Sequence, residues 1–203
     1  MEYHIVRCGV NGSTAVSKTV GRGSSPCIVA KIGAGMLELN KLNYDREALI
    51  PSISKINLSF HHDVLAKGYV DRFNANQGDV EFNSAGAKLH NLLFEQYKPY
   101  QADNEISGLA KTFILDNFAG IEEFKRIFLG KCLELKGSGW VYLSKHGKIK
   151  QIKNHKYKED IVFLIDMWEH AWMMDYKIDK VGYVNNHWLI LDWDVINKRI
   201  KAE

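Results

Sequence analysis

The chain has 203 residues, which gives room for one sizeable core or two small domains, and its net charge of +3 is too small to indicate nucleic-acid binding. No apolar run is long enough to span a membrane, and the N-terminus lacks the apolar stretch of a signal peptide, so neither is expected. Three widely spaced cysteines, Cys8, Cys27 and Cys132, do not make a disulfide framework or a zinc site, and they favour reduced thiols in a cytoplasmic compartment.

Residues 1–40 are rich in glycine, serine and valine, and the alternation of residue types over 13–20 predicts extended segments joined by turns. The glycines at 33 and 35 are too few for a phosphate-binding loop.

Apolar residues recur at helical spacing from Ser54 to about Tyr97, which predicts two helices packed as a hairpin. Ile56, Phe60 and Leu65 mark the first helix, and Leu89 and Leu93 mark the second. Each helix carries one histidine expected to point inward, His61 in the first and His90 in the second.

From Ile106 the pattern becomes mixed. Helical periodicity over 118–128 leads to three short strands near 140–143, 149–152 and 161–165, and a last helix starts near Tyr183. The lysines between 145 and 158 are interpreted as a solvated hairpin. Asp166 and His170 follow the third strand, and a strand end is a common place for metal ligands because the strand fixes the backbone.

The segment from Asp166 to Tyr176 reads Asp-Met-Trp-Glu-His-Ala-Trp-Met-Met-Asp-Tyr, and it resembles the C-terminal metal signature of the iron/manganese superoxide dismutases. Family members usually begin close to residue 42, so the resemblance implies that residues 1–40 are an added N-terminal arm. Other positions agree with that family over residues 42 to 203. They are Tyr44, Leu49, Pro51, Ile53, Ser54, His61, Tyr69 and Val70, the run from Asn83 to His90, the Gly-Ser-Gly-Trp run ending at Trp140, and Tyr183, Trp188 and Trp193.

The resemblance implies an α+β fold with the metal site between two domains. Residues 41–103 would form an α-helical hairpin domain, and residues 104–203 would form an α/β domain with a small antiparallel sheet. It also implies one iron or manganese ion per chain, because three imidazoles and a carboxylate suit either metal. The ligands that it implies are His61, His90, Asp166 and His170.

Each histidine also has an ordinary interpretation. His61 could lie on the surface beside His62, and His90 could pack on a helix face. The order of all four ligands along the chain favours the metal role for these two, whereas His4, His62, His146 and His187 keep the structural interpretation.

His155 is a candidate for the group that holds solvent at the metal and tunes its redox potential. Many family members use a glutamine four residues before the second ligand, but this chain has Gly86 there. Its Lys153-Asn-His155 run is similar to the archaeal-type members, which place a histidine after the Gly-Ser-Gly-Trp run. The alternative is an exposed loop histidine among lysines.

Two positions depart from the family. Leu65 stands where a histidine is common, and Met173 stands where a tyrosine from the other subunit meets that histidine. Loss of one partner would leave a buried polar group unpaired, at a cost of about 1–3 kcal/mol, but loss of both leaves an apolar contact. A dimer with a changed proton path is therefore expected.

The resemblance implies disproportionation of superoxide to dioxygen and hydrogen peroxide. Tyr69 would supply a gateway hydroxyl, and His155 would orient solvent. Trp140 and Trp168 would form an apolar wall, with Tyr142 where a second tryptophan is common. Glu169 would bridge to His170 of a second subunit in a homodimer. Lys67 is a candidate for attracting the superoxide anion.

A second hypothesis is that the chain is a structural subunit with the superoxide dismutase fold in a larger particle, such as a virion, anchored by residues 1–40. The arm and the changes at Leu65 and Met173 motivate it. The complete ligand set argues against an inactive site.

Overall fold

The computed structural model describes residues 35–202, so the expectations for residues 1–34 lie outside the described part of the chain. Within that part, no helix is both long enough and apolar enough to cross a bilayer.

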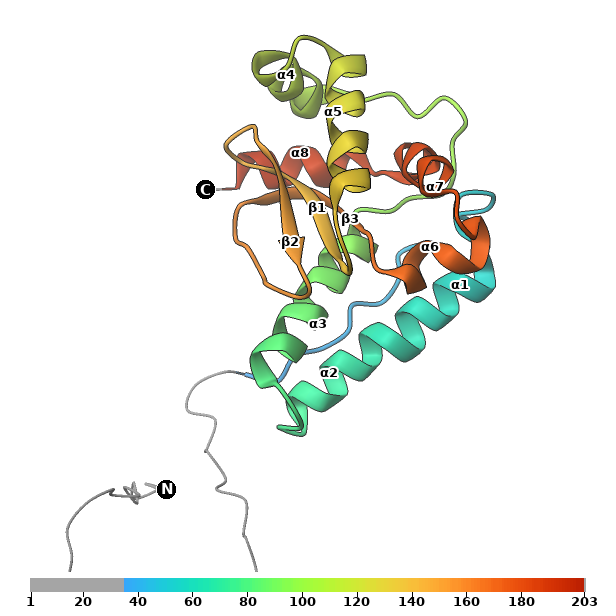
Figure 1. Ribbon diagram of the computed structural model, residues 1–203, viewed down its shortest axis with the longest axis vertical. Coiled ribbons are helices and arrows are strands. Elements are labelled where there is room, and N and C mark those ends of the chain that lie inside the picture. Colours follow the sequence, from blue (N-terminus) through green and yellow to red (C-terminus); the bar gives the residue numbers. More distant parts are fainter. Residues whose placement is uncertain (1–34, 203) are drawn as a thin grey trace, which may run out of the picture. The chain divides into compact units, whose positions relative to one another are not determined.

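The first half of the described chain is a helical hairpin (Figure 1). One continuous helix runs through α1, η1 and α2, and α3 returns beside it. The side chain of Ser54 caps the first helix by accepting from the backbone N–H of Asn57, and Asp79 caps α3 by accepting from that of Phe82. The segments are α1 (Lys55–Ser59), the π-helical η1 (Phe60–Ala66), α2 (Lys67–Asn74) and α3 (Val80–Glu95).

The π-helical segment η1 contains both His61 and His62. π-Helical segments are rare in proteins, and those that occur often lie at functional sites. Both rings are buried, so the pair does not divide into one inward and one exposed histidine. His62 bonds to the Asp63 carboxylate at 2.7 Å and to the carbonyl of Asn40 at 2.9 Å, which agrees with its structural interpretation.

The second half of the chain combines helices with a small sheet. Its elements are α4 (Gly108–Asn117), α5 (Ile121–Glu134), β1 (Gly139–Ser144), β2 (Ile149–Lys153), β3 (Ile161–Asp166), α6 (Glu169–Tyr176), α7 (Lys180–His187), the 3₁₀-helix η2 (Trp188–Ile190) and α8 (Trp193–Lys201).

The three strands form an antiparallel sheet in the order β2-β1-β3. Every residue of β1 and β3 is buried, because helices α5, α3 and α8 pack against these strands. In β2 the buried position is Ile152 alone. The predicted strands, the helical hairpin and the α+β class are confirmed.

The helices around the sheet differ in detail from the expectation. The sequence pattern did not separate α4, which buries only Ala110 and Ile114 and therefore carries a weak apolar stripe. Residues 169–176 form a helix that the pattern also left undescribed. The single last helix predicted from Tyr183 is wrong, because the chain forms α7, a 3₁₀ turn and α8.

The outer edge of β3 is paired with a side chain. The amide of Gln96 donates to the carbonyl of Leu164 at 2.6 Å and accepts from the N–H of Leu164 at 3.2 Å. The Arg199 guanidinium lies 3.5 Å from the carbonyl of Val162, further along the same edge. Gln96 thus ties the end of α3 to β3.

His187 is buried beside this edge, where its Nε2 lies 3.3 Å from the carbonyl of Leu164 and its Nδ1 lies 3.4 Å from the hydroxyl of Tyr97. Burial lowers the pKa of His187 to about 3. The native state therefore keeps the ring neutral where the unfolded chain, with a histidine pKa near 6.5, takes up a proton.

We expect His187 to make the folded protein lose stability as pH falls from about 6.5 toward 3, because the unfolded state binds more protons over that range. In His187→Gln, the free energy of unfolding should fall less steeply, by about 1.4 kcal/mol per pH unit. Urea unfolding of metal-free protein between pH 6 and 4.5 measures both slopes. Parallel slopes would contradict a buried neutral His187.

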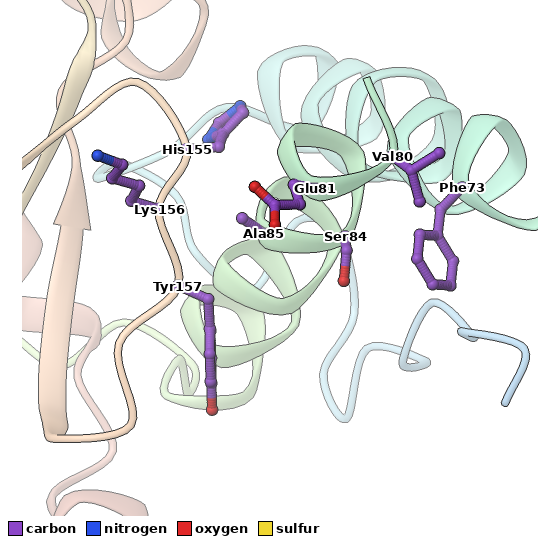
Figure 2. Close-up of a pocket in the computed structure, with 8 residues that line it drawn as sticks. All are labelled: Phe73, Val80, Glu81, Ser84, Ala85, His155, Lys156 and Tyr157. Carbon is purple, nitrogen blue, oxygen red and sulfur yellow. The ribbon is translucent and has the colours of Figure 1, made fainter. Parts of the chain in front are cut away.

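A surface pocket of about 360 Å³ lies between the hairpin and the loop that follows β2 (Figure 2). Of the residues predicted for the site, only His155 lines it, so the pocket adjoins that side of the site. The lining residues are Phe73, Val80, Glu81, Ser84, Ala85, His155, Lys156 and Tyr157.

Candidate metal centre

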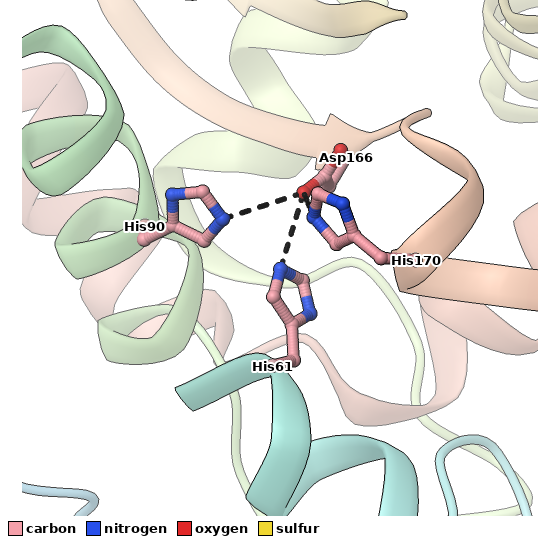
Figure 3. A group of neighbouring side chains, drawn as sticks. All are labelled: His61, His90, Asp166 and His170. Carbon is pink, nitrogen blue, oxygen red and sulfur yellow. Dashed lines mark hydrogen bonds and ion pairs between the residues drawn. The ribbon is translucent and has the colours of Figure 1, made fainter. Parts of the chain in front are cut away.

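Four side chains from four separate elements meet between the hairpin and the sheet (Figure 3). His61 comes from η1, His90 from α3, and His170 from the first turn of α6, while Asp166 is the last residue of β3. Their ligand atoms all lie within 4.8 Å of one another. The structure thus brings together all four predicted metal ligands.

The Oδ2 atom of Asp166 is the common neighbour of the three rings. The Nε2 atoms of His61 and His170 each lie 3.2 Å from it, and that of His90 lies 3.6 Å from it. In His61 and His90 this nitrogen is buried and has no well-formed hydrogen bond among the described residues. Buried polar atoms that converge without hydrogen bonds fit a bound cation.

Burial sets the charge states in this cluster. It lowers the pKa of His61 and lowers that of His90 further, so both rings are neutral and offer a lone pair. Burial alone would raise the pKa of Asp166, but the neighbouring His170 and His61 outweigh it and hold that pKa below its usual range. Neutral imidazoles with an ionised carboxylate fit one iron or manganese ion per chain.

Hydrogen bonds outside the cluster orient these ligands. Nδ1 of His90 lies 2.7 Å from the carbonyl of Gly86, so Nδ1 carries the proton and Nε2 faces Asp166. Asp166 accepts from the N–H of Trp168 through Oδ1 at 2.8 Å, and its carbonyl accepts from the hydroxyl of Tyr183 at 2.9 Å. The sequence pattern gave no signal for this bond from Tyr183.

His155 lies beside the cluster and is buried, in contrast to the exposed-loop alternative. Its Nδ1 accepts from the indole N–H of Trp140 at 3.1 Å, and its Nε2 has no hydrogen-bond partner among the described residues. The ring stacks on Trp168 with 4.7 Å between centroids. Burial lowers the pKa of His155 to about 4, so the neutral ring carries its proton on Nε2.

Gly86 leaves the space that His155 and Tyr69 use. A Cβ atom at Gly86 would come within 2.9 Å of the Tyr69 ring and 3.2 Å of the His155 ring. A glutamine there is therefore sterically incompatible with this arrangement, which explains in physical terms why Gly86 and His155 occur together.

The other predicted site residues differ in whether they contact the cluster. Tyr69 stacks on His90 with 5.3 Å between ring centroids, and burial raises the pKa of its hydroxyl. Trp140 is fully buried and meets His90 edge-on at 5.0 Å. Tyr142 instead donates from its hydroxyl to Asp160, on the loop before β3, at 3.1 Å.

Residues on the outer side of α6 and the first helix are open to solvent in the single chain. Glu169 is exposed beside His170, Met173 is 46% exposed, and Leu65 is half-buried. The exposed Lys67, proposed to attract superoxide, forms an ion pair with Asp71.

Comparison with known proteins gives matches over both halves of the chain. Residues 36–87 match the alpha-hairpin domain of the iron/manganese superoxide dismutases, and residues 106–199 match the C-terminal domain of the same family. The two matches include His61, Asp166 and His170 of the cluster, and His90 lies in the segment between them.

Individual relatives agree with this result. The chain is 33% identical over 190 residues to the iron superoxide dismutase of Bacteroides fragilis, covering 80% of this chain and 98% of that protein. It is 31% identical over 189 residues to the manganese/iron superoxide dismutase of Porphyromonas gingivalis, with 80% and 98% covered. The iron superoxide dismutase of Saccharolobus solfataricus is 28% identical over 196 residues, with 81% and 93% covered. With its hairpin, its sheet and its cluster of three histidines and one aspartate, the chain belongs to the iron/manganese superoxide dismutase family.

Proposed function

We propose that this protein is a superoxide dismutase whose metal ion is held by His61, His90, Asp166 and His170. The observation that carries the proposal is the convergence of three imidazole nitrogens on one buried carboxylate oxygen. Relatives named as iron and manganese/iron superoxide dismutases support the same reaction. None of these names describes a particle subunit, so the comparisons favour the enzyme over the alternative.

The reaction converts two superoxide anions and two protons into dioxygen and hydrogen peroxide. When bound, iron or manganese supplies the one-electron chemistry by passing between its divalent and trivalent states. The protein residues hold the ion, limit access of water and provide protons. Trp140 and Trp168 supply the apolar wall of the site.

His155 is proposed to orient solvent or substrate in the centre. Because its Nδ1 accepts from Trp140, its Nε2–H is the free donor. Tyr69, protonated because burial raises its pKa, is proposed as the hydroxyl on the access path. Both rings lie against His90, at 5.3 Å for Tyr69 and 5.7 Å for His155, so both can act beside a ligand.

Purified protein tests the function directly. Metal-free protein reconstituted with iron or with manganese should bind one ion per chain, and at least one of the two forms should dismutate superoxide. The metal-free form should be inactive. A chain that is fully loaded with each metal and fails to dismutate superoxide would refute the proposal.

We propose that the chain divides into the arm 1–40, the hairpin domain 41–103 and the α/β domain 104–203, with the ion joining the last two. His61 and His90 lie in the hairpin, and Asp166 and His170 lie in the α/β domain. The free, buried Cys132 supports a compartment that keeps thiols reduced, and the cytoplasm is the location proposed.

A homodimer is proposed through the exposed face of the first helix and α6. The first helix has the exposed apolar side chains of Phe60 and Val64, and α6 has the exposed side chains of Met173 and Glu169. The His170 side chain keeps 16% of its surface exposed beside Glu169. In a symmetric dimer, each Glu169 would accept from the His170 ring of the second copy.

We expect Glu169→Ala to weaken both the dimer and metal binding, because each carboxylate would orient a ligand of the other copy. Sedimentation velocity and metal analysis of the same samples measure the two effects. Glu159→Ala, an exposed carboxylate on the loop before β3, is the control and should change neither. A Glu169→Ala dimer with unchanged dissociation would refute this interface.

A further inference from the structure

The helix that carries His61 and the helix that carries His170 are joined by a buried amide. Asn57 lies in α1, and its Nδ2 donates to the carbonyl of Ala171 at 3.0 Å and to Oδ2 of Asp175 at 3.0 Å. The same Oδ2 accepts from the backbone N–H of Ser54 at 2.9 Å. Asp175 thus bonds to the N-terminus of the first helix, where a carboxylate is favourable.

The place of Asn57 along the chain links this junction to the ligands. Asn57 precedes His61 by four residues, about one helical turn, so the two side chains extend from neighbouring turns of one helix. Ala171 directly follows His170. One side chain therefore connects the turn before the first ligand to the peptide after the last ligand.

Burial of the Asn57 amide carries a cost in free energy of folding. Asn57 is 1% exposed, and its Oδ1 is buried without a hydrogen-bond partner among the described residues. A buried, unpaired acceptor has lost its hydrogen bonds to water without replacing them, and an apolar side chain of the same shape would avoid that cost. Stability alone thus gives a weak reason for an asparagine at this position.

We propose that Asn57 is a positioning residue that fixes the separation of His61 and His170 before the metal binds. This inference rests on the proposed function, since it takes these two rings as ligands. Their ring centroids are 4.8 Å apart, and both Nε2 atoms lie 3.2 Å from Asp166 Oδ2. Without the amide, α6 loses its side-chain tie to α1 at Ala171, and the two rings gain freedom relative to each other.

The test compares Asn57→Leu with Asn104→Leu. Asn104 also donates from its amide to two backbone carbonyls, those of Trp188 and Leu191, both at 2.8 Å, but neither of these residues adjoins a ligand. Each variant loses two hydrogen bonds that the amide donates, to one carbonyl and one carboxylate at 3.0 Å for Asn57 and to two carbonyls at 2.8 Å for Asn104. Only Asn57→Leu removes a link between ligand-bearing elements.

The readouts are the rate of metal loss to a chelator and the electron paramagnetic resonance spectrum of the ferric form, with urea unfolding as the measure of stability. Asn57→Leu should release metal about tenfold faster and alter the ferric spectrum, as expected for a lost support of a ligand. Asn104→Leu should leave both unchanged, whatever it does to stability. Asn57→Ser, which shortens the side chain and removes the amide, should behave like Asn57→Leu and carries the test if the leucine variant does not fold.

An Asn57 variant with the wild-type spectrum and rate of metal loss would overturn the positioning role while leaving the dismutase proposal intact. Failure of the wild-type protein to bind metal or to dismutate superoxide would instead overturn the proposed function.

Discussion

His90→Ala is expected to produce a folded protein that retains no iron or manganese after dialysis. His90 is fully buried in α3, and among the described residues its Nε2 approaches only Asp166 Oδ2, 3.6 Å away, so it is free to bind the proposed ion. Alanine removes one of the four proposed metal ligands and opens a cavity beside Tyr69 and Trp140 that admits water. The three remaining ligands would then bind metal too weakly to survive dialysis, and dismutase activity would be lost with the metal.

The matched control is His62→Ala. His62 is also buried in the hairpin, but its ring bonds to Asp63 and Asn40 rather than facing the cluster. His62→Ala should lower the free energy of unfolding and keep the metal. Elemental analysis distinguishes the two variants, and full metal occupancy in His90→Ala would show that His90 is not a ligand.

His155→Ala is expected to keep its metal and to lose turnover, by about tenfold or more. The variant leaves all four proposed ligands in place, so metal content should not change. It removes a buried ring whose Nδ1 accepts from the indole N–H of Trp140 and whose Nε2–H has no acceptor in the described chain. Pulse radiolysis with metal analysis of the same sample measures turnover per bound ion.

Two further variants sharpen this test. His146→Ala removes an exposed histidine of the β1–β2 turn and should leave turnover unchanged. His155→Gln keeps an N–H donor and should recover part of the lost rate. Wild-type turnover per metal ion in His155→Ala would reduce the role of His155 to packing against Trp168 and Phe82.

Local sequence patterns predicted the helices and strands whose buried apolar residues follow a regular pattern along the chain. The apolar run ending at Ile165 predicted β3 because a strand buried on both faces is apolar throughout. The first helix and α3 were found for the same kind of reason, from apolar residues spaced three and four apart. Helix α4 buries two residues and left no such pattern.

The candidate site was predictable to the extent that its residues match a known signature. Spacing alone gave Asp166 and His170 as a weak pair, and the family resemblance added His61 and His90. The geometry could not be predicted in this way, because Asp166 meets a helix more than a hundred residues away in the sequence. Asn57 and Gln96 left no signal for a similar reason: each is an ordinary polar residue in a helix until its distant partner is known.

The Gln96 amide also has a consequence for solubility. In the order β2-β1-β3, the outer edge of β3 would present free backbone groups that could pair with a strand from another molecule. Gln96 occupies both backbone groups of Leu164, and Arg199 lies against the carbonyl of Val162, so these edge groups are blocked from pairing with another strand. Loss of the Gln96 and Arg199 contacts would expose the edge of a strand rich in β-branched and aromatic residues, a composition that assembles into fibrils, even in molecules that had already folded.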